Sequence, residues 1–324
     1  MKHYLKLFII LSCLLGLTAC HQEKSSAIKI GIVVPLEHTA MKEIVSGFSE
    51  TLTKLYHHPV TIKVANAQSD SNLQRAIIEQ MHDENDTIIV PIGTGATEMT
   101  LAMARNQPVV SLAAEMSEQD RQQRHPCNVA IVHDEISPKQ IIAFIHAAYP
   151  EIKSIALIHS TADKVFPEVK ETIAAGKQYG MTITPVMAAT LPDLTSAAQS
   201  LPQQTQAIFI LKDNLIVSGI STLAKIANER HIPLITSDQG SVQDGAGFAL
   251  GVHEREIGVE GAKLAAAILS GKSACTLPIA EMKTLTVFIN KTALKQETQN
   301  ELTVSDAAKK MGYATEITDK KMGT

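Results

Sequence analysis

Two glycine-containing turns come closest to a nucleotide-binding pattern. Gly93-Thr94-Gly95 follows an apolar run and precedes a helical pattern, but Glu98 stands where a dinucleotide-binding turn needs its third glycine. Gly271-Lys272-Ser273 is similar to the end of a phosphate-binding loop, but Ala266 replaces the required earlier glycine. The nucleotide signal is therefore weak. What remains of the first turn is a helix N-terminus, whose free N–H groups favour a carboxylate.

Catalytic and metal-binding patterns are incomplete as well. His159, Ser160 and Asp163 lie close in sequence, but no Gly-x-Ser-x-Gly motif surrounds the serine, and catalytic triads normally converge from separate strands. The clusters His133-Asp134-Glu135 and His253-Glu254 lack the His-Glu-x-x-His or Cys-x-x-Cys spacing of a metal site. We therefore predict no catalytic residue, no metal site and no cofactor.

The polar residues that stand out follow predicted strands. Ligands of doubly wound sheets bind beyond the carboxyl ends of the strands. A single polar residue there is common in a surface loop, whereas carboxylates and amides from two lobes could face one cleft. The positions are Glu37-His38, Asn66-Ala67-Gln68 and Gly93-Thr94 in the first half, and Ser160, Asp213-Asn214 and Ser237-Asp238 in the second.

Short apolar runs alternate with helical patterns and predict the elements that position these residues. The runs are continuous, as expected of strands buried on both faces, and βαβ alternation requires parallel sheets. Two consecutive sets predict an α/β fold of two doubly wound parallel-sheet lobes, with a hinge near 130–136 and a ligand cleft between the lobes. The predicted strands are 28–34, 60–65, 87–92, 108–113, 154–159, 181–186, 207–212, 232–237, 247–252 and 284–290, and the predicted helices are 39–55, 72–84, 94–106, 137–148, 165–179, 194–201, 215–229 and 254–269.

Each lobe is predicted to consist of two separate stretches of the chain. We expect lobe 1 to span residues 27–131 and to be completed by about 254–285. Lobe 2 is expected to span 132–253 and to be completed by about 286–294. The polar composition that follows predicts a peripheral, partly ordered tail over 295–324.

The first residues predict export and a lipid anchor. Lysines precede a short apolar run from Leu7 to Leu17, which is too short for a permanent membrane helix and is typical of a signal peptide. Leu17-Thr18-Ala19-Cys20 is similar to the lipobox of bacterial lipoproteins, in which Cys20 is lipidated. The alternative is an ordinary secretory signal with a chance cysteine. We expect a signal peptide over 1–19 and a tether over 20–26.

Composition narrows the class of protein. Of 324 residues, 45% are apolar and 4% are aromatic, and 29 Lys and Arg face 33 Asp and Glu. The apolar fraction excludes a disordered chain, and the net charge of −4 gives nucleic-acid phosphates nothing to attract them. Four cysteines exclude a scaffold built on disulfides. The length suits two lobes with packed cores.

Six segments in register resemble the tryptophan/tyrosine-type substrate-binding proteins of ABC importers, within the type I periplasmic binding fold. The resemblance covers about residues 27–294 and is carried by IGIVVPLEHTAM, VANAQSD, IIVPIGTGATE, IFILKDN, IPLITSDQG and GVHEREIGVEGAKLAAAILSGK. It implies two lobes that close around a ligand and do no chemistry on it. It also implies ligand-binding roles for Glu37, Gln68, Thr94, Gly95, Asp213, Asn214 and Asp238.

These residue types suit an α-amino acid. Asp213 or Asp238 can accept hydrogen bonds from an ammonium group, and Thr94 with its neighbouring N–H groups can donate to a carboxylate. Two segments depart from the family pattern, Ile131-Val132-His133-Asp134 and His253-Glu254-Arg255, the second replacing aromatic residues. Aromatic partners for a ligand are therefore scarce, and Phe166 is the best candidate, with helix packing as its alternative role.

The resemblance implies a lipoprotein of the cell envelope that captures a small zwitterionic solute. Its partners would be the ligand and the permease subunits of an ABC importer, with no nucleic acid, membrane attachment by lipid only, and a monomeric state. In a Gram-negative cell the protein would face the periplasm. Two alternatives remain open: a ligand-sensing protein whose closed form a receptor recognises, and an enzyme that uses a nucleotide at Gly93-Thr94-Gly95.

Two cysteines remain in the predicted core. Cys127 precedes the strand that leads to the hinge, and Cys275 follows a helix that should return to the same lobe, so both are expected at the end of lobe 1 away from the cleft. They could be two separate buried thiols. Export to an oxidising compartment favours a disulfide between them.

Overall fold

The computed structural model describes residues 28–319, apart from 117, 124–126 and 298. Lobe 1 holds a six-stranded parallel sheet with the order β11-β5-β4-β3-β1-β2. Its elements are β1 (Ile28–Val34), α2 (Thr39–Leu55), β2 (Val60–Asn66), α3 (Ser71–Asp83), β3 (Ile88–Pro91), α4 (Thr94–Met103), β4 (Val109–Leu112), α5 (Glu118–Gln123) and β5 (Val129–His133), joined later by α12 (Glu254–Leu269), the 3-10 turn η2 (Ala274–Thr276) and β11 (Ala280–Glu281).

Lobe 2 holds a seven-stranded sheet with the order β13-β12-β10-β9-β8-β6-β7, in which only the β10–β12 pair is antiparallel. Its elements are α6 (Pro138–Ala148), β6 (Ser154–His159), α7 (Val165–Gln178), β7 (Thr182–Met187), α8 (Leu191–Gln199), β8 (Ala207–Ile210), α9 (Asn214–Ser218), α10 (Ile220–Arg230), β9 (Leu234–Thr236), α11 (Gln239–Gln243), β10 (Phe248–Gly251), β12 (Thr286–Asn290), α13 (Lys291–Gln296), α14 (Glu301–Met311) and β13 (Ala314–Thr318).

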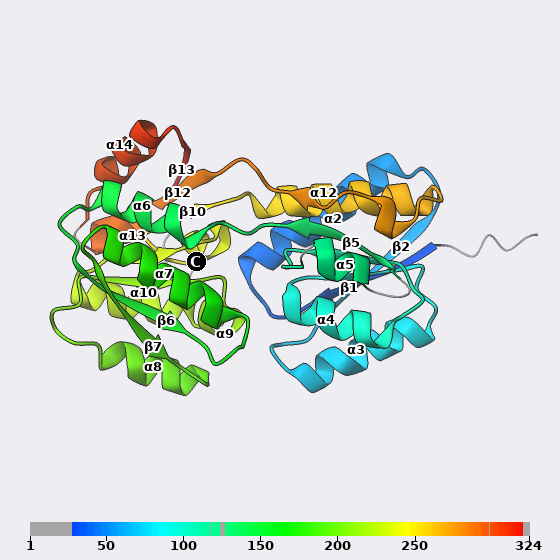
Figure 1. Ribbon diagram of the computed structural model, residues 1–324, viewed down its shortest axis with the longest axis horizontal. Helices are drawn as coiled ribbons and strands as arrows, with labels where there is room; N and C mark the ends of the chain where they lie inside the picture. Colours follow the sequence, from blue (N-terminus) through cyan, green and yellow to red (C-terminus); the bar gives the residue numbers. More distant parts are fainter. Residues whose placement is uncertain (1–27, 117, 124–126, 298, 320–324) are drawn as a thin grey trace, which may run out of the picture.

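Helices cover both faces of the sheets, and the two lobes lie side by side along the long axis (Figure 1). In lobe 1, α2 and α12 lie above the sheet in this view, and α3 and α4 lie below it. β3, β4, β8 and β10 are accordingly buried at every position, which explains their continuous apolar sequences. The carboxyl ends of the parallel strands lie at one edge of each sheet. Most of the predicted ligand-binding residues directly follow these strand ends.

Aspartates begin several helices at these strand ends. Asp70 accepts hydrogen bonds from the first N–H groups of α3, Asp213 from Leu215 N of α9, and Asp238 from Ser241 N of α11. A capping carboxylate satisfies N–H groups that a helix start leaves without partners. Asp213 and Asp238 therefore stabilise local structure, whatever else they bind.

The helix α12 connects the lobes. It follows the lobe 2 strand β10 and packs along α2 of lobe 1, where Gly47 and Gly258 bring the two backbones together. A Cβ at Gly258 would lie 2.6 Å from Phe48 N and would also overlap the Ile44 carbonyl, so this approach requires glycine. The chain also passes between the lobes after β5 and between β11 and β12, so three segments form the hinge.

Several boundaries differ from the sequence prediction. β5 continues to His133, past the lobe boundary expected after residue 131. The helix predicted over 215–229 is instead two helices, α9 and α10, which meet at Gly219. A Cβ at Gly219 would overlap Leu194 of α8, and this tertiary contact leaves no trace in the helical periodicity. The short helices α5 and α11 were not predicted, because so few residues carry no clear period.

The C-terminal segment is more ordered than the peripheral tail expected over 295–324. As far as residue 319, it forms the end of α13, α14 and β13. α14 buries Val304, Ala307 and Ala308, and β13 adds a parallel edge strand to β12. β13 is held mainly through its backbone and is largely exposed, so its polar sequence did not reveal it as a strand.

Cys127 and Cys275 lie at the end of lobe 1 opposite the carboxyl ends of its strands. Cys127 precedes β5, and Cys275 lies in η2 after α12. Their Cα atoms are 5.9 Å apart across 148 residues of sequence, and the structure joins their sulfurs in a disulfide. The bond ties the segment that returns from lobe 2 to the lobe 1 sheet.

Candidate functional site

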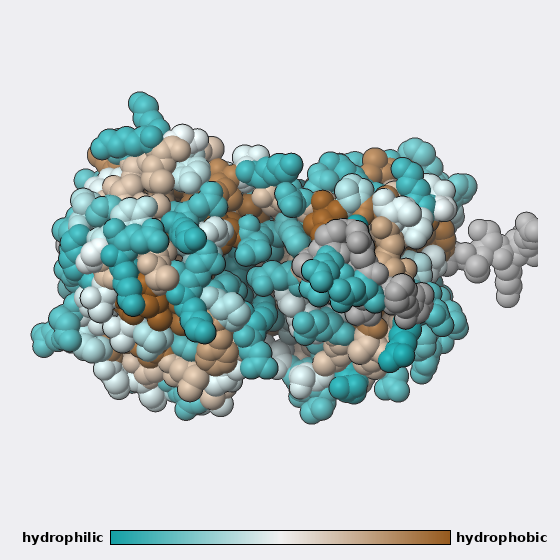
Figure 2. Space-filling view, viewed as in Figure 1, coloured by the Kyte–Doolittle hydropathy of each residue, from teal (hydrophilic) through white to brown (hydrophobic). Residues whose placement is uncertain are grey.

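A cavity of about 100 Å³ lies between the two lobes, at the carboxyl ends of their strands. This volume suits several water molecules or a small organic ligand. Hydrophilic side chains gather along the waist between the lobes (Figure 2). The apolar part of the lining is aliphatic and includes Met41, Ile44, Ile92, Ile141, Leu211 and Ile257.

Lobe 1 contributes a helix start and a hydroxyl group. Gly93 and Thr94 line the cavity where α4 begins, and Gly93 has a φ of 86°, a conformation that favours glycine. Thr94 Oγ1 accepts a hydrogen bond from Glu115 N at 3.1 Å, which leaves the hydroxyl proton for a second partner. The first N–H groups of α4 add a partial positive charge. This corner can therefore bind a carboxylate.

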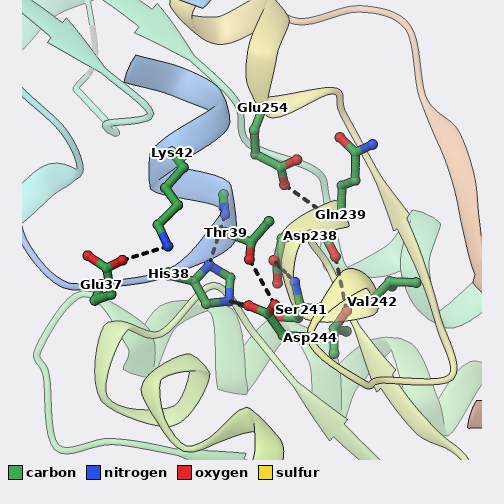
Figure 3. A network of polar contacts seen from close by, with 12 residues as sticks. Glu37, His38, Thr39, Lys42, Asp238, Gln239, Ser241, Val242, Asp244 and Glu254 are labelled. Carbon is green, nitrogen blue, oxygen red and sulfur yellow. Dashed lines mark hydrogen bonds and ion pairs between the residues drawn. The ribbon is translucent and has the colours of Figure 1, made fainter. Parts of the chain in front are cut away.

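The opposite corner of the cavity, which we call the lobe 2 corner, has a hydroxyl group and a carboxylate from lobe 2 (Ser237 and Asp238) and a second carboxylate from Glu254, at the start of α12. Asp238 Oδ1 accepts from Ser241 N at 2.7 Å, and Glu254 Oε1 accepts from Gln239 N at 2.8 Å (Figure 3). Ser237 lies directly before Asp238 and also lines the cavity. Burial and, next, the Asp238 carboxylate raise the pKa of Glu254 to about 8, although Lys212 lowers it. This corner can therefore bind a cation.

An ion pair ties the end of β8 to the hinge. Lys212 Nζ contacts the Asp134 carboxylate and donates to the Asp134 carbonyl at 2.9 Å. Burial lowers the pKa of Lys212, but the Asp134 carboxylate more than offsets this, so the net pKa is raised and the lysine stays charged. Lys212 therefore forms its ion pair with Asp134.

A second acidic group lines the cavity where α7 begins. It consists of Glu115, Glu135 and Glu168, with Lys164 beside them. Burial raises the pKa of Glu168 to about 7, and Glu115 is the next largest cause. Burial and Glu135 likewise raise the pKa of Glu115. These carboxylates raise the pKa of one another because negative charge exceeds positive charge along this wall.

A set of contacts that we call the α2–α11 bridge joins the lobes on one side of the cavity (Figure 3). Thr39 Oγ1 donates to Asp244 Oδ1 at 2.8 Å. His38 Nε2 lies 3.6 Å from Asp244 Oδ2 and 3.5 Å from Ser241 Oγ. Since α2 belongs to lobe 1 and α11 to lobe 2, these contacts exist only while the lobes are close.

Three of the predicted ligand-binding residues line the cavity: Thr94, Asn214 and Asp238. Gly95 lies next to Thr94 in the first turn of α4 but is exposed and outside the lining. Asp213 is buried outside the lining, where it accepts from Ser160 N at 2.6 Å and from Leu215 N. Its position at a strand end therefore reflects a folding role.

Glu37 and Gln68 lie away from the cavity. The Glu37 side chain is 69% exposed and pairs with Lys42 at 2.6 Å, and this contact lowers the pKa of Glu37. Gln68 is exposed, with a φ of 51°, and its N–H donates to Asn66 Oδ1 at 2.7 Å. Both residues follow lobe 1 strands, yet neither contacts lobe 2 in the described contacts.

Sequence reasoning missed several charged residues of the lining. Glu115, Glu135, Glu168, Lys212 and Glu254 were not proposed as ligand-binding residues, although each lies at or near the end of a strand or at the start of a helix. Glu254 had one signal: it opens a helix in a segment that departs from the family pattern. Glu115, Glu135 and Lys212 follow strands and Glu168 lies in the first turn of α7, all without a distinctive motif.

Phe166 does not reach the cavity. It is 41% exposed, and its ring meets the His159 ring edge-on at 5.8 Å. No Phe or Tyr is among the lining residues in the described part of the chain. The contact with His159 fits the packing role for Phe166.

Ser160 and His159 are not placed as a nucleophile and its base. Ser160 Oγ accepts from Ala162 N at 3.1 Å, while His159 Nδ1 contacts the Ser160 carbonyl at 2.8 Å, so the imidazole does not face the hydroxyl. No group of three or more His, Cys, Asp or Glu in the described ranges is placed to hold a metal ion. Across those same ranges, no helix is long and apolar enough to cross a bilayer.

Comparison with known proteins agrees with this architecture. An uncharacterized protein of Rickettsia prowazekii is 40% identical over 279 residues, which is 85% of this chain and 88% of the relative. A tyrosine-binding protein of Clostridioides difficile is 26% identical over 294 residues, covering 86% and 85% of the two chains. The structure of an ABC domain in complex with L-Trp, from Streptococcus pneumonia, superposes with a TM-score of 0.78 at 21% identity, covering 86% and 98%.

The family comparison covers nearly all of the two lobes. Residues 29–311 match the family described as ABC transporter substrate binding protein, from β1 to the end of α14. The matched range includes every residue that lines the interlobe cavity. On this evidence the chain belongs to the family of ABC transporter substrate binding proteins.

Proposed function

We propose that this protein captures an α-amino acid outside the cytoplasm and delivers it to the permease of an ABC importer. The observation that carries the proposal is one cavity between two lobes, with the α4 start on one side and Asp238 on the other. The first can hold a carboxylate and the second an ammonium group. Two relatives, a tyrosine-binding protein and a domain that binds L-Trp, support an amino acid as the ligand.

The α2–α11 bridge fits a protein that closes around its ligand. Thr39 and His38 contact Asp244 across the two lobes, so a ligand held by both lobes and the bridge favour the same closed arrangement. We propose that a permease recognises this closed form. The protein is proposed to act as a monomer, because each lobe supplies its part of the cavity within one chain.

A saturating ligand should stabilise the protein. At a concentration one hundred times its dissociation constant, a ligand that binds only the folded state adds about 2.7 kcal/mol to the free energy of unfolding. Thermal unfolding of the mature protein against a panel of amino acids and nucleobases measures this gain, after mass spectrometry of whatever co-purifies. Stabilisation by nucleobases alone would contradict an amino-acid ligand.

We also propose that Cys20 anchors the mature chain by a lipid. Residues 1–27 lie outside the described part, so this proposal depends on the sequence of residues 1–20. Cys20→Ser should move the protein from the detergent phase to the aqueous phase in a phase-partition assay of the expressing cells. Cys13→Ser is a matched control within the signal peptide and should leave partitioning unchanged. Detergent partitioning of Cys20→Ser equal to that of the wild type would refute the anchor.

A further inference from the structure

Three polar atoms without hydrogen-bond partners meet in the lobe 2 corner of the cavity. They are Ser237 Oγ, Asp238 Oδ2 and Glu254 Oε2. The three residues are only 4%, 5% and 4% exposed, yet all of them line the cavity. Buried polar groups in folded proteins almost always have partners, so three such atoms at one place indicate a group that binds there.

A backbone N–H group holds one oxygen of each carboxylate and so fixes its orientation. Asp238 Oδ1 is held by Ser241 N at 2.7 Å and Glu254 Oε1 by Gln239 N at 2.8 Å, so each residue has one oxygen left (Figure 3). α11 and α12 thus preorganise two acceptors beside a hydroxyl. Two carboxylate oxygens and a hydroxyl match the three N–H donors of a primary ammonium group or the fork of a guanidinium.

The acidic residues of the lining outnumber its basic residues by more than a zwitterionic ligand would balance if all were ionised. Six carboxylates line the cavity with only two lysines. One lysine, Lys212, makes its described hydrogen bonds to Asp134 rather than to Asp238 or Glu254. A single α-ammonium would be offset by the ligand's own carboxylate and would leave Glu115, Glu135 and Glu168 with one neighbouring cation among the described lining residues, Lys164.

We propose that Ser237, Asp238 and Glu254 form a subsite for a primary ammonium or guanidinium group, and that the ligand is an amino acid with a cationic side chain. One cationic group binds this corner, and the other faces the group of Glu115, Glu135 and Glu168. The carboxylate of the ligand binds the start of α4 at Thr94. The inference rests on the proposed function, because it specifies which amino acids the same cavity takes.

The aliphatic lining agrees with this choice of ligand. No Phe or Tyr among the described residues lines the cavity, so an aromatic side chain would find no ring to stack on. Met41, Ile44 and Ile257 instead offer apolar surface to the methylene groups of a lysine-like or arginine-like side chain.

Calorimetric titration of the mature protein with five compounds tests the inference. The compounds are L-lysine, L-arginine, L-alanine, L-tyrosine and cadaverine, which has two ammonium groups and no carboxylate. We expect L-lysine or L-arginine to bind at least tenfold more tightly than L-alanine and L-tyrosine. Glu254→Gln should weaken that binding by about ten- to a hundredfold, since it removes the ionised form of Glu254 that a bound cation favours while keeping the acceptor for Gln239 N.

Glu256→Gln is the matched control. Glu256 lies in the same first turn of α12, is exposed and does not line the cavity, so the substitution makes the same charge change without touching the subsite. Unfolding of both variants without ligand shows that they are folded. Equal affinity of Glu254→Gln and the wild type for the basic amino acid would overturn the subsite.

The remaining outcomes separate this inference from the proposed function. Tighter binding of L-tyrosine or L-alanine than of the basic amino acids would overturn the inference and support an amino-acid ligand. Binding of cadaverine as tight as that of L-lysine would support the cation subsite and contradict the carboxylate contact at Thr94. Failure of all five compounds to bind would overturn the inference, while stabilisation by another amino acid in the panel would preserve the proposed function.

Discussion

Replacing both Cys127 and Cys275 by alanine is expected to lower the free energy of unfolding by about 4–5 kcal/mol. The two residues are 148 apart in sequence, so the bond closes a long loop and removes much freedom from the unfolded chain. It also ties η2, which follows α12, to the segment that precedes β5. Denaturant unfolding of the oxidised wild type and the double variant measures the difference.

The ligand cavity should be unaffected, because both cysteines lie at the opposite end of the lobe 1 strands. Ligand affinity at low temperature, where both forms are folded, is therefore the control. Alkylation of unreduced, denatured chains from residue 21 onward counts the free thiols directly. Complete alkylation of both cysteines in that sample would show that the bond does not form, and the predicted loss of stability would then be absent.

Gly240→Leu is expected to weaken ligand binding by about five- to a hundredfold with little effect on the stability of the unliganded protein. A Cβ at Gly240 of α11 would lie 2.5 Å from Ala40 N and 2.9 Å from His38 Cε1. Both atoms belong to lobe 1, so a leucine would act as a wedge between the lobes. Overpacking costs about 1–3 kcal/mol, and here the cost falls on the closed arrangement that holds the ligand.

Calorimetric titration measures the loss of ligand affinity, and denaturant unfolding without ligand measures the stability of the unliganded variant. Gln243→Leu is a control on the same short helix, since Gln243 is only half-buried and does not line the cavity. Unchanged affinity of Gly240→Leu would show that ligand binding does not need the α2–α11 bridge. A large loss of stability without ligand would show that the contact with Ala40 belongs to the fold itself.

The sequence predicted the parts of the fold that depend on local pattern. Continuous apolar runs such as 28–34 and 154–159 became strands with the predicted bounds, because helices on both faces of the sheet bury most of their side chains. The two-lobed α/β architecture followed from the repetition of these units. The break at Gly219 and the strand β13 were missed, because each depends on a partner far along the chain.

The candidate site was predicted less completely than the fold. Asp213 and Asp238 each follow a strand and precede a short helix, and both cap that helix. Only Asp238 lines the cavity, while Asp213 is occupied by Ser160 N. Sequence position cannot separate the two, because the difference lies in which way each carboxylate turns. Glu254 was missed because its role depends on Asp238 and on the approach of α12 to α11.

A crystal structure of the mature protein grown with saturating L-lysine is the most direct test of the account. We expect density for the amino acid between the lobes, with an amine within hydrogen-bonding distance of Asp238 and Glu254 and the carboxylate at Thr94. Ligand density outside this cavity, or an empty cavity in crystals of protein that binds L-lysine in solution, would contradict it.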